Sequence, residues 1–461
     1  MPADLWEENN NTMVIRRAIE PTDWPRFRIY ARRIHGFAVG KRRKSMRPSA
    51  KCLLALARAK PHDIPHLFPN VRSWHWPSLL SDASDEAFQC MPLMMSIATE
   101  AVDFNLNGLG VIGLPSVQSM LSTFPAIQNV RIWGEPENPL VLQALPDFFS
   151  HGQALRSAAI VNIPLSGSVA QHLAGFEHLA RLSVFLDHRW SSSQISGFQA
   201  LVDLSIESGT FHPMLLFLRI IESPKLQSVS LCTMDLIEPA AHEIASIFTT
   251  LVPQFPHMQL RSLRVHTQFM HPSGLSNFVE RDDMRPLFAF RNLSCLELWI
   301  STSFHMGNQD VREMAAAWPH LESLILSRNG WLGASSVTIA GLAHLLCLPD
   351  LHTLSIPIDG SIVDLTLEMT SALQRNTRIQ SLNLLDSVIN DSEADAVATL
   401  LATLTPNVEY IDAWDCTTVC RTEATSWQLA AEYRDRWNKV ARMVSEKNKG
   451  ISEEVVAAFI D

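Results

Sequence analysis

The chain has 461 residues, of which 47% are hydrophobic and 18% are charged, a composition that excludes a disordered chain. Residues 1–60 contain 14 Lys and Arg against 5 Asp and Glu, whereas the remaining residues contain 23 against 42, which makes them a poor candidate for binding nucleic acid. Because the length exceeds what one hydrophobic core supports, we expect several domains or an array of repeats.

Neither a membrane segment nor a disulfide framework is expected. No apolar run approaches the roughly 18 residues of a membrane helix, and the acidic N-terminus has no apolar signal core. The seven cysteines are an odd number, spread from Cys52 to Cys420. These features predict reduced thiols in a cytoplasmic or nuclear protein that does not contact a membrane.

Residues 22–39 are predicted to form a helix that runs into the first strand. Asp23 is a candidate N-cap, and Pro25 falls in the first turn, where its missing N–H costs nothing. An apolar stripe follows along one face of this helix: Trp24, Phe27, Ala31 and Ile34. We expect the helix to cap the N-terminal end of the structure that follows.

A short basic run, Lys41-Arg42-Arg43-Lys44, follows this helix. It is typical of a solvated loop. It also fits a nuclear-import signal or a contact with an anionic partner, and the sequence does not decide among the three.

One pattern then recurs along most of the chain: an apolar residue, two variable residues, an apolar residue, one variable residue and an apolar residue. Its clearest copy is Leu321-Glu-Ser-Leu324-Ile-Leu326. A weaker copy begins at Ile34. The first apolar position falls at Val71, Ala101, Ile127, Leu155, Leu179, Leu201, Leu226, Leu260, Leu293, Leu321, Leu351, Ile379 and Val408. The alternation predicts short strands with one buried face.

Helices are predicted between these strands, because apolar residues recur there at three- and four-residue steps. Examples are Val337–Leu346, Leu365–Leu373 and Asp391–Leu404. A strand, a helix and a return in about 28 residues is typical of a leucine-rich repeat. We therefore expect an α/β solenoid, a horseshoe with a parallel concave sheet, outer helices and a helical cap at each end. The alternative, a doubly wound enzyme, requires longer and more continuously apolar strands.

One loop raises a nucleotide-binding alternative. Gly108-Leu-Gly110-Val-Ile-Gly113 matches the dinucleotide fingerprint and follows a predicted strand at Ala101–Leu106. That strand alternates where a buried parallel strand should be apolar, and Pro115 follows soon after the third glycine. The same stretch also fits one repeat.

The C-terminal region is predicted to hold a second cap. Its apolar residues step along one face of a helix: Leu429, Tyr433, Trp437, Val440 and Val444. Before it, Cys416 and Cys420 lack the partners that zinc requires, so no metal is expected. The expected organisation is a basic N-terminal segment with a capping helix at 1–60, irregular repeats at 61–420, and a capping helix and tail at 421–461.

The N-terminal phrase Asp23-Trp-Pro-Arg-Phe-Arg-Ile-Tyr-Ala-Arg-Arg-Ile34, with Phe68-Pro-Asn-Val71 and Trp318-Pro-His-Leu-Glu-Ser-Leu324, resembles the leucine-rich-repeat portion of F-box-like proteins of mushroom-forming fungi. The resemblance spans roughly residues 20–440. It implies a substrate receptor of a cullin-based (SCF-type) ubiquitin ligase, in which F-box helices hold the ligase adaptor and repeats hold the substrate. The roughly 20 residues before Trp24 are too few for an F-box, so we expect adaptor binding only if one lies upstream.

In such a solenoid, the residues between the apolar strand positions face the concave surface. Exposed aromatic residues beside charges are typical of protein interfaces. The candidate protein-binding residues are Arg131, Trp133, Phe185, Arg264, His266, Glu297, Trp299, Ile325, Leu385 and Trp414. An inserted segment around Arg281–Arg285 is a second candidate contact, and loops or caps could cover some members of the set.

The sequence therefore predicts a non-catalytic scaffold that binds a protein substrate and needs no cofactor. The resemblance makes this prediction more specific: the scaffold would be the substrate receptor of a ubiquitin ligase. The alternatives are a stand-alone interaction scaffold and a nucleotide-dependent enzyme built on the Gly108–Gly113 loop.

Overall fold

The structure is a computed structural model that describes residues 4–9, 12–37, 47–76, 85–191, 195–234, 239–255, 258–268, 278–300, 302–327, 330–331, 335–365, 373–414 and 427–458. The chain forms two compact units. Unit 1 comprises Met1–Leu204 and Ile220–Ser223, and unit 2 comprises Ser205–Arg219 and Pro224–Asp461.

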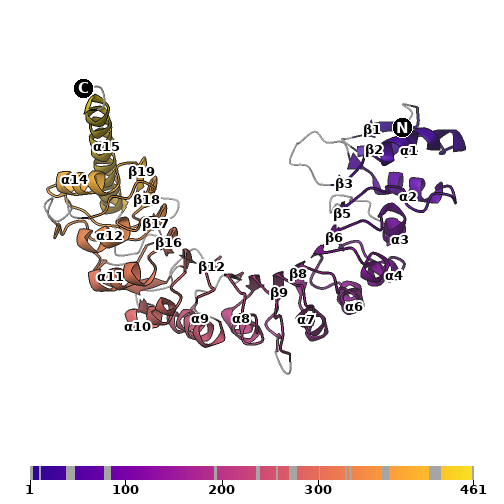
Figure 1. Cartoon of the computed structure of the whole chain (residues 1–461), viewed down its shortest axis with the longest axis horizontal. Helices are drawn as coiled ribbons and strands as arrows, with labels where there is room; N and C mark the ends of the chain where they lie inside the picture. Colours follow the sequence, from indigo (N-terminus) through magenta and orange to yellow (C-terminus); the bar gives the residue numbers. More distant parts are fainter. Residues whose placement is uncertain are drawn as a thin grey trace. The chain divides into compact units, whose positions relative to one another are not determined.

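Fourteen short strands form one sheet in which each strand neighbours the strand of the next repeat, and within each unit helices cover one side of the strands (Figure 1). The pairs from β3 to β9 and from β11 to β19 are parallel. The strands are β3 (Gly36–Phe37), β5 (Ser73–Trp76), β6 (Ala101–Asn105), β7 (Asn129–Trp133), β8 (Ser157–Pro164), β9 (Arg181–Leu186), β10 (Asp203–Ser208), β11 (Ser228–Thr233), β12 (Ser262–Thr267), β14 (Cys295–Trp299), β16 (Ser323–Leu326), β17 (Thr353–Ser355), β18 (Ser381–Asn383) and β19 (Tyr410–Asp412).

This arrangement confirms the predicted fold class, an α/β leucine-rich-repeat solenoid. Thirteen of these strands begin two residues after the predicted first apolar position, so the repeat pattern located them in register. The exception is β6, where the predicted start at Ala101 is two residues late. Its partner register, Ser73 with Ala101, places Thr99 opposite Val71.

Thr99 occupies a core position although it is polar, and its hydrogen bonds explain how. It is fully buried. Its hydroxyl donates to the Val71 carbonyl at 3.1 Å and accepts from the Ser96 N–H at 3.1 Å. Because both polar groups are satisfied, the threonine takes the place of an apolar residue without an unpaired group in the core.

The helices follow the strands in each unit, as Figure 1 shows. Unit 1 contains α1 (Trp24–Ala31), α2 (Ala50–Arg58), α3 (Asp85–Met94), α4 (Leu114–Gln118), α5 (Met120–Thr123), α6 (Pro139–Phe149) and α7 (Gly167–Ala174). Unit 2 contains α8 (Phe211–Leu218), α9 (Ala241–Gln254), α10 (Arg281–Met284), α11 (Asn308–Ala317), α12 (Ile339–Leu346), α14 (Ala394–Leu404) and α15 (Trp427–Ala458). The predicted helices at Val337–Leu346 and Asp391–Leu404 correspond to α12 and α14, whereas most of Leu365–Leu373 lies outside the described residues.

The N-terminal helix runs into the first strand, as predicted. Residues 22–39 contain the end of a 3₁₀ turn (Pro21–Asp23), then α1 and then β3. Of the predicted apolar stripe, Trp24, Phe27 and Ala31 lie on α1, whereas Ile34 lies between the helix and the strand. Phe37 pairs with Trp74 of β5, and their ring centroids lie 4.4 Å apart.

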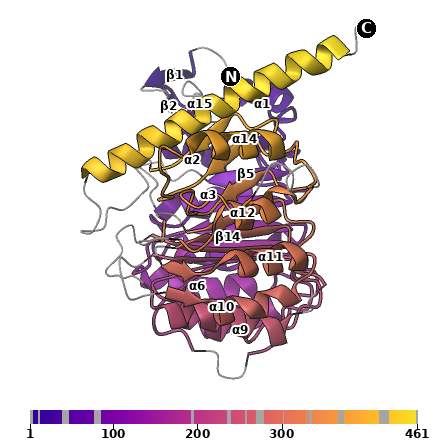
Figure 2. The same cartoon turned by 90° about the vertical axis from the view of Figure 1, so that its left-hand side faces the viewer.

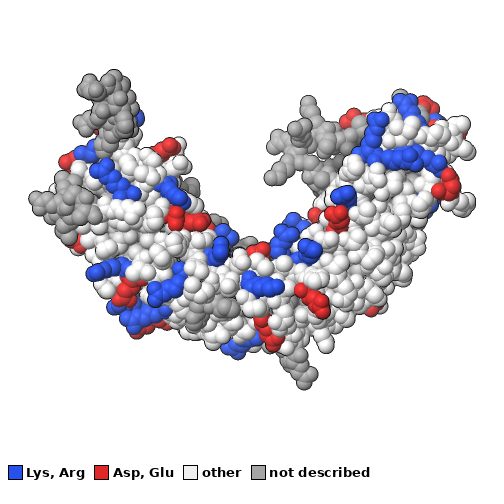
Figure 3. Space-filling model, viewed as in Figure 1, with Lys and Arg blue, Asp and Glu red and all other residues white. Residues whose placement is uncertain are grey.

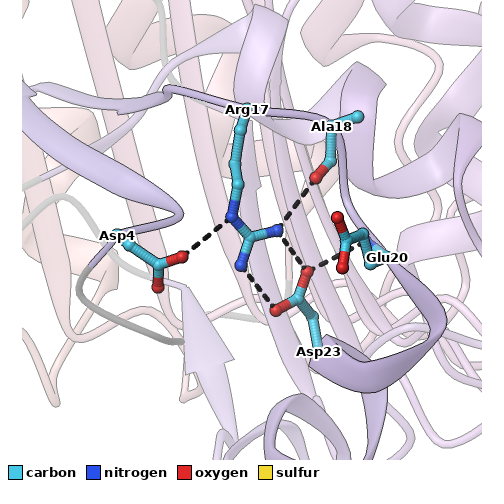
Figure 4. Close-up of polar contacts among 5 residues, drawn as sticks. All are labelled: Asp4, Arg17, Ala18, Glu20 and Asp23. Carbon is cyan, nitrogen blue, oxygen red and sulfur yellow. Dashed lines mark hydrogen bonds and ion pairs between the residues drawn. The ribbon is translucent and has the colours of Figure 1, made fainter.

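A hairpin that the sequence did not predict precedes α1. Strand β1 (Trp6–Asn9) is antiparallel to β2 (Thr12–Ile15), which pairs with β4 (Arg47–Pro48). Behind the hairpin, the Arg17 guanidinium donates to both oxygens of Asp23 at 2.8 and 2.9 Å and to Asp4 at 2.9 Å (Figure 4). Asp23 also accepts from the Glu20 N–H. Asp23 is therefore not the side-chain cap of α1 that we predicted; instead it joins the hairpin to the helix.

At the other end, α15 packs against α14 and β19 in unit 2, and Figure 2 shows it crossing α14. Its residues Trp437, Val440 and Val444 are buried, whereas Leu429 is 36% exposed. The Trp437 indole N–H donates to the Ser387 carbonyl at 2.9 Å, which fixes the helix on the last repeats.

Two of the predicted features cannot be placed. The basic run Lys41–Lys44 and the pair Cys416 and Cys420 lie outside the described residues. Within the part of the chain that the structure describes, no helix is both long and apolar enough to cross a membrane, and no cluster of His, Cys, Asp and Glu could hold a metal ion.

Candidate protein-binding faces

The sheet in each unit has a buried side and an open side. In β7, Val130 and Ile132 are buried in the core, whereas Arg131 is exposed and Asn129 and Trp133 are half-buried. The strands β6 to β12 repeat this alternation. Residues two apart therefore line one open face, where they can contact a partner.

A polar and aromatic cluster lies on the open face of unit 1 and joins β5, β6 and β7. The His75 Nδ1 lies 2.8 Å from one oxygen of Asp103, and the Trp133 indole N–H donates to the other oxygen at 3.0 Å. The Arg131 guanidinium carbon lies 4.2 Å from the Trp133 ring centroid, which is a cation–π contact. We name these four residues cluster 1.

Unit 2 has a cluster of the same residue types on its open face, which joins β12 and β14. The Arg264 guanidinium donates to Glu297 at 3.1 Å, and the rings of His266 and Trp299 stack with centroids 6.1 Å apart. The register pairs Arg264 with Glu297 and His266 with Trp299 directly across the two strands. We name these four residues cluster 2.

The carboxylate of cluster 2 stays ionised. Burial raises the pKa of Glu297, but hydrogen bonding from the Cys295 thiol and the charge of Arg264 outweigh it, so its pKa lies below the ordinary value. Burial raises the pKa of Cys295, which therefore donates as a neutral thiol. Glu297 thus binds the guanidinium of Arg264 as a carboxylate, and the raised pKa of Cys295 disfavours a reactive thiolate.

A hollow of about 510 Å³ lies on the open face of unit 1, beside cluster 1. His75, Asp103 and Arg131 line it together with small side chains, which include Ser73, Ala101, Ser157 and Ala159. Figure 3 shows Lys and Arg side chains over the strands β6 to β8, with Asp and Glu beside them. The small floor residues leave room for side chains of a bound segment.

Six of the ten predicted binding residues therefore fall in the two clusters. Phe185 is half-buried on β9 and pairs with Pro164, where the β8–β9 register is irregular. The remaining three, Ile325, Leu385 and Trp414, are only 7%, 1% and 8% exposed, so their predicted exposure was wrong.

The reasons for these three corrections differ. Every residue of β16 is buried, Ile325 included. Leu385 lies beyond the end of β18, in a turn at φ 49°, where strand alternation no longer applies. Trp414 follows β19, donates to the Ser387 carbonyl at 2.7 Å and stacks on Tyr433 of α15. The C-terminal helix thus covers a residue that the repeat pattern alone would expose.

The sequence reasoning also missed two members of cluster 1. Asp103 was not predicted, since the repeat at β6 was placed two residues late. His75 stands at the same position of the preceding repeat but was not selected. A correct register between β5 and β6 identifies both, since His75 pairs with Asp103.

The glycine loop that suggested nucleotide binding holds a side chain of the protein instead. Asp85, at the start of α3, accepts hydrogen bonds from the N–H groups of Gly110, Ile112 and Gly113 at 2.6–2.7 Å. A Cβ at Gly110 would lie 2.4 Å from the Asp85 carboxylate. The close approach of this carboxylate explains the glycines, and it occupies the donors that a phosphate would need.

The second predicted contact, around Arg281–Arg285, is committed to internal ion pairs. Arg281 lies 2.5 Å from Asp310 and 2.8 Å from Glu313, both on α11, and Arg285 lies 2.9 Å from Asp282. These pairs fix α10 beside α11 and leave the segment less available to a partner.

No family model matches the sequence, and no curated protein matches it. Among solved structures, the chain is similar to yeast Rad7 from its complex with Elc1, with 16% identity, a TM-score of 0.41, and coverage of 81% of this chain and 84% of Rad7. It is also similar to the leucine-rich repeat-containing protein LegL7 of Legionella pneumophila, with 12% identity, a TM-score of 0.30, and coverage of 84% and 94%. Because both TM-scores are low, the fold assignment depends on the strand order and register of this chain.

Proposed function

We propose that the protein is a non-catalytic scaffold that binds another protein on the open faces of its sheet. The observation that carries the proposal is the pair of clusters, each made of a His, a carboxylate, an Arg and a Trp. Trp and Arg dominate the binding energy of protein interfaces, especially when they are held in place before binding.

The internal bonds of the clusters favour recognition over catalysis. Both oxygens of Asp103 have partners, and Glu297 is bonded to Arg264 and Cys295. Carboxylates that are committed in this way orient their neighbours and are poorly placed to move protons of a substrate.

Affinity capture with quantitative mass spectrometry tests the proposal. The full-length protein and its variants Trp133→Ala and Trp299→Ala are used as baits, with Gln171→Ala on the exposed side of α7 as the matched control. We expect a set of proteins that the control retains and that one Trp variant loses by at least about tenfold, the loss of roughly 1.4 kcal/mol of binding energy. Capture that is equal for all four baits would contradict the proposal.

The ligase-receptor role is the finer form of this proposal, and the N-terminal helix supports it. Trp24, Phe27 and Ala31 of the family-like phrase are buried in α1, as a capping helix requires. The described residues before α1 form the β1–β2 hairpin, so the F-box helices that would hold an adaptor are not among them. Copurification of the full-length protein with the ligase adaptor tests this role, and failure to recover the adaptor leaves a stand-alone scaffold.

A further inference from the structure

Arg131 is held on the open face of unit 1 by a chain of contacts. His75 contacts Asp103, Asp103 accepts from the Trp133 indole, and the Trp133 ring lies against the Arg131 guanidinium. A guanidinium on an aromatic face keeps its N–H groups at its edge, where they can bind a carboxylate through two hydrogen bonds. The chain therefore fixes a cation and leaves its donor edge open.

Two further arginines are exposed near Arg131. Arg156 precedes β8 and Arg181 begins β9. Within the described part of unit 1, neither Arg131 nor Arg156 forms an ion pair, and Arg181 contacts only the amide of Asn129, at 3.5 Å. Arg131 on β7 and Arg181 on β9 thus stand at open-face positions, and Arg156 lies at the edge of the sheet, directly before β8.

The carboxylates of this region offset the cations only in part. Both oxygens of Asp103 are engaged, one by the His75 ring and one by the Trp133 indole, and Glu100 lies 3.8 Å from Arg72. Asp203 begins β10, beside the strand of Arg181. Three arginines in this region, Arg131, Arg156 and Arg181, therefore stand against two carboxylates, Asp103 and Asp203, an excess of one positive charge. They lie next to a hollow of about 510 Å³ with a floor of small residues.

Unit 2 has the opposite balance on its own open face. Its one arginine at an open-face position of the described strands, Arg264, is paired with Glu297. Glu207 stands at the same kind of position on β10. Charge complementarity therefore favours an acidic partner segment on the open face of unit 1.

We propose that the open face of unit 1 binds an extended acidic segment of a partner protein, with a carboxylate of that segment on the edge of Arg131. This inference rests on the proposed function and names the chemistry of the partner. Strands lie about 4.8 Å apart and rise about 3.3 Å per residue, so the Cα atoms of Arg131 and Arg181 are about 12 Å apart. An extended segment spans this distance in three to four residues, which favours acidic residues at that spacing.

Fluorescence anisotropy with a defined probe tests the inference on the full-length protein. The probe is a short labelled peptide of repeating Glu-Ser-Gly, and a Gln-Ser-Gly peptide of equal length is the uncharged control. We expect the Glu peptide alone to bind at low ionic strength and to be released by salt. Arg131→Gln should weaken its binding about five- to tenfold, the loss of one charge-assisted contact. Arg58→Gln on α2 makes the same change of net charge on the helix side and should leave binding unchanged.

The same binding measurement tests whether Asp103 positions Trp133 and Arg131. Asp103→Asn keeps the side-chain shape but removes the charge that orients Trp133 and His75. If the only effect of the substitution were to remove a negative charge from the face, the variant would bind the Glu peptide more tightly. If it positions Trp133 and Arg131, as we infer, binding weakens although the net charge has become more positive.

The outcomes separate this inference from the proposed function. Equal binding of the Glu and Gln peptides, or equal affinity of the wild type and the Arg131→Gln variant, overturns the acidic-partner inference. If partner capture still depends on Trp133 while the Glu peptide does not bind, only this inference fails. If capture is also indifferent to Trp133 and Trp299, the proposed function fails with it.

Discussion

At the scale of single residues, polar side chains fix local features of the structure that the apolar repeat pattern does not specify. Asp85 fills the glycine loop through three N–H donors, and Arg17 ties the N-terminal hairpin to α1 through Asp23. The exposure of Trp414 depends on Tyr433, which is near it only after folding. None of these contacts follows from the apolar repeat pattern, because that pattern places buried apolar residues and does not specify partners for polar side chains.

We expect Asp85→Ala to lower the free energy of unfolding by about 1–3 kcal/mol, because it leaves three N–H groups without their charged acceptor. Asp85→Asn should cost less, since the amide oxygen still accepts. Urea denaturation measures both changes. An unchanged stability, or stabilisation of the wild type by NAD in a thermal-shift assay, would show that the loop serves a nucleotide instead.

The Arg17–Asp23 pair predicts an acid-dependent loss of stability. Hydrogen bonds from Arg17 lower the pKa of Asp23 to about 2, below its unfolded value of about 3.9. The stabilisation is therefore fully present above about pH 4 and is lost as the pH falls toward 2. Denaturation of the wild type and of Asp23→Asn across this range should converge at low pH. A constant difference between the two proteins would contradict the ion pair.

At the scale of elements, the repeat pattern located nearly all of the sheet. Its strength is that buried positions of β-strands are spaced by two, and this spacing survives irregular repeat lengths. It failed at β6, where Thr99 replaces an apolar residue. Six of the eight residues of the two clusters were predicted as open-face residues. Leu385 was misplaced because it lies beyond the end of β18, and Trp414 because the C-terminal helix covers it.

Substitution of Thr99 distinguishes the stability predicted from the apolar repeat pattern from the stability predicted from the hydrogen bonds in the structure. The apolar pattern predicts that Thr99→Val is neutral or stabilising. The hydrogen bonds predict a loss of about 1–3 kcal/mol, because the Ser96 N–H and the Val71 carbonyl would be left unpaired in the core. Thr99→Ser keeps the hydroxyl and is the control for the hydrogen bonds. Urea denaturation of the three proteins distinguishes the two predictions.

At the scale of the whole molecule, two compact units present open sheet faces of opposite charge balance. Each face carries a cluster whose side chains are oriented by bonds across neighbouring strands. The repeat architecture provides this orientation, because parallel strands in register bring equivalent positions side by side. The predicted role as a protein-binding scaffold depends on these faces being the surfaces that partners contact.

Site-specific photo-crosslinking tests this dependence most directly. A photoreactive phenylalanine analogue replaces Ser183 or Ser230 on the open faces of β9 and β11, or the exposed helix residues Gln171 or Thr249 on α7 and α9. In extracts, the two strand positions should give discrete crosslinked partner bands, and the two helix positions should give none. Bands that arise from the helix positions alone would contradict binding at the sheet.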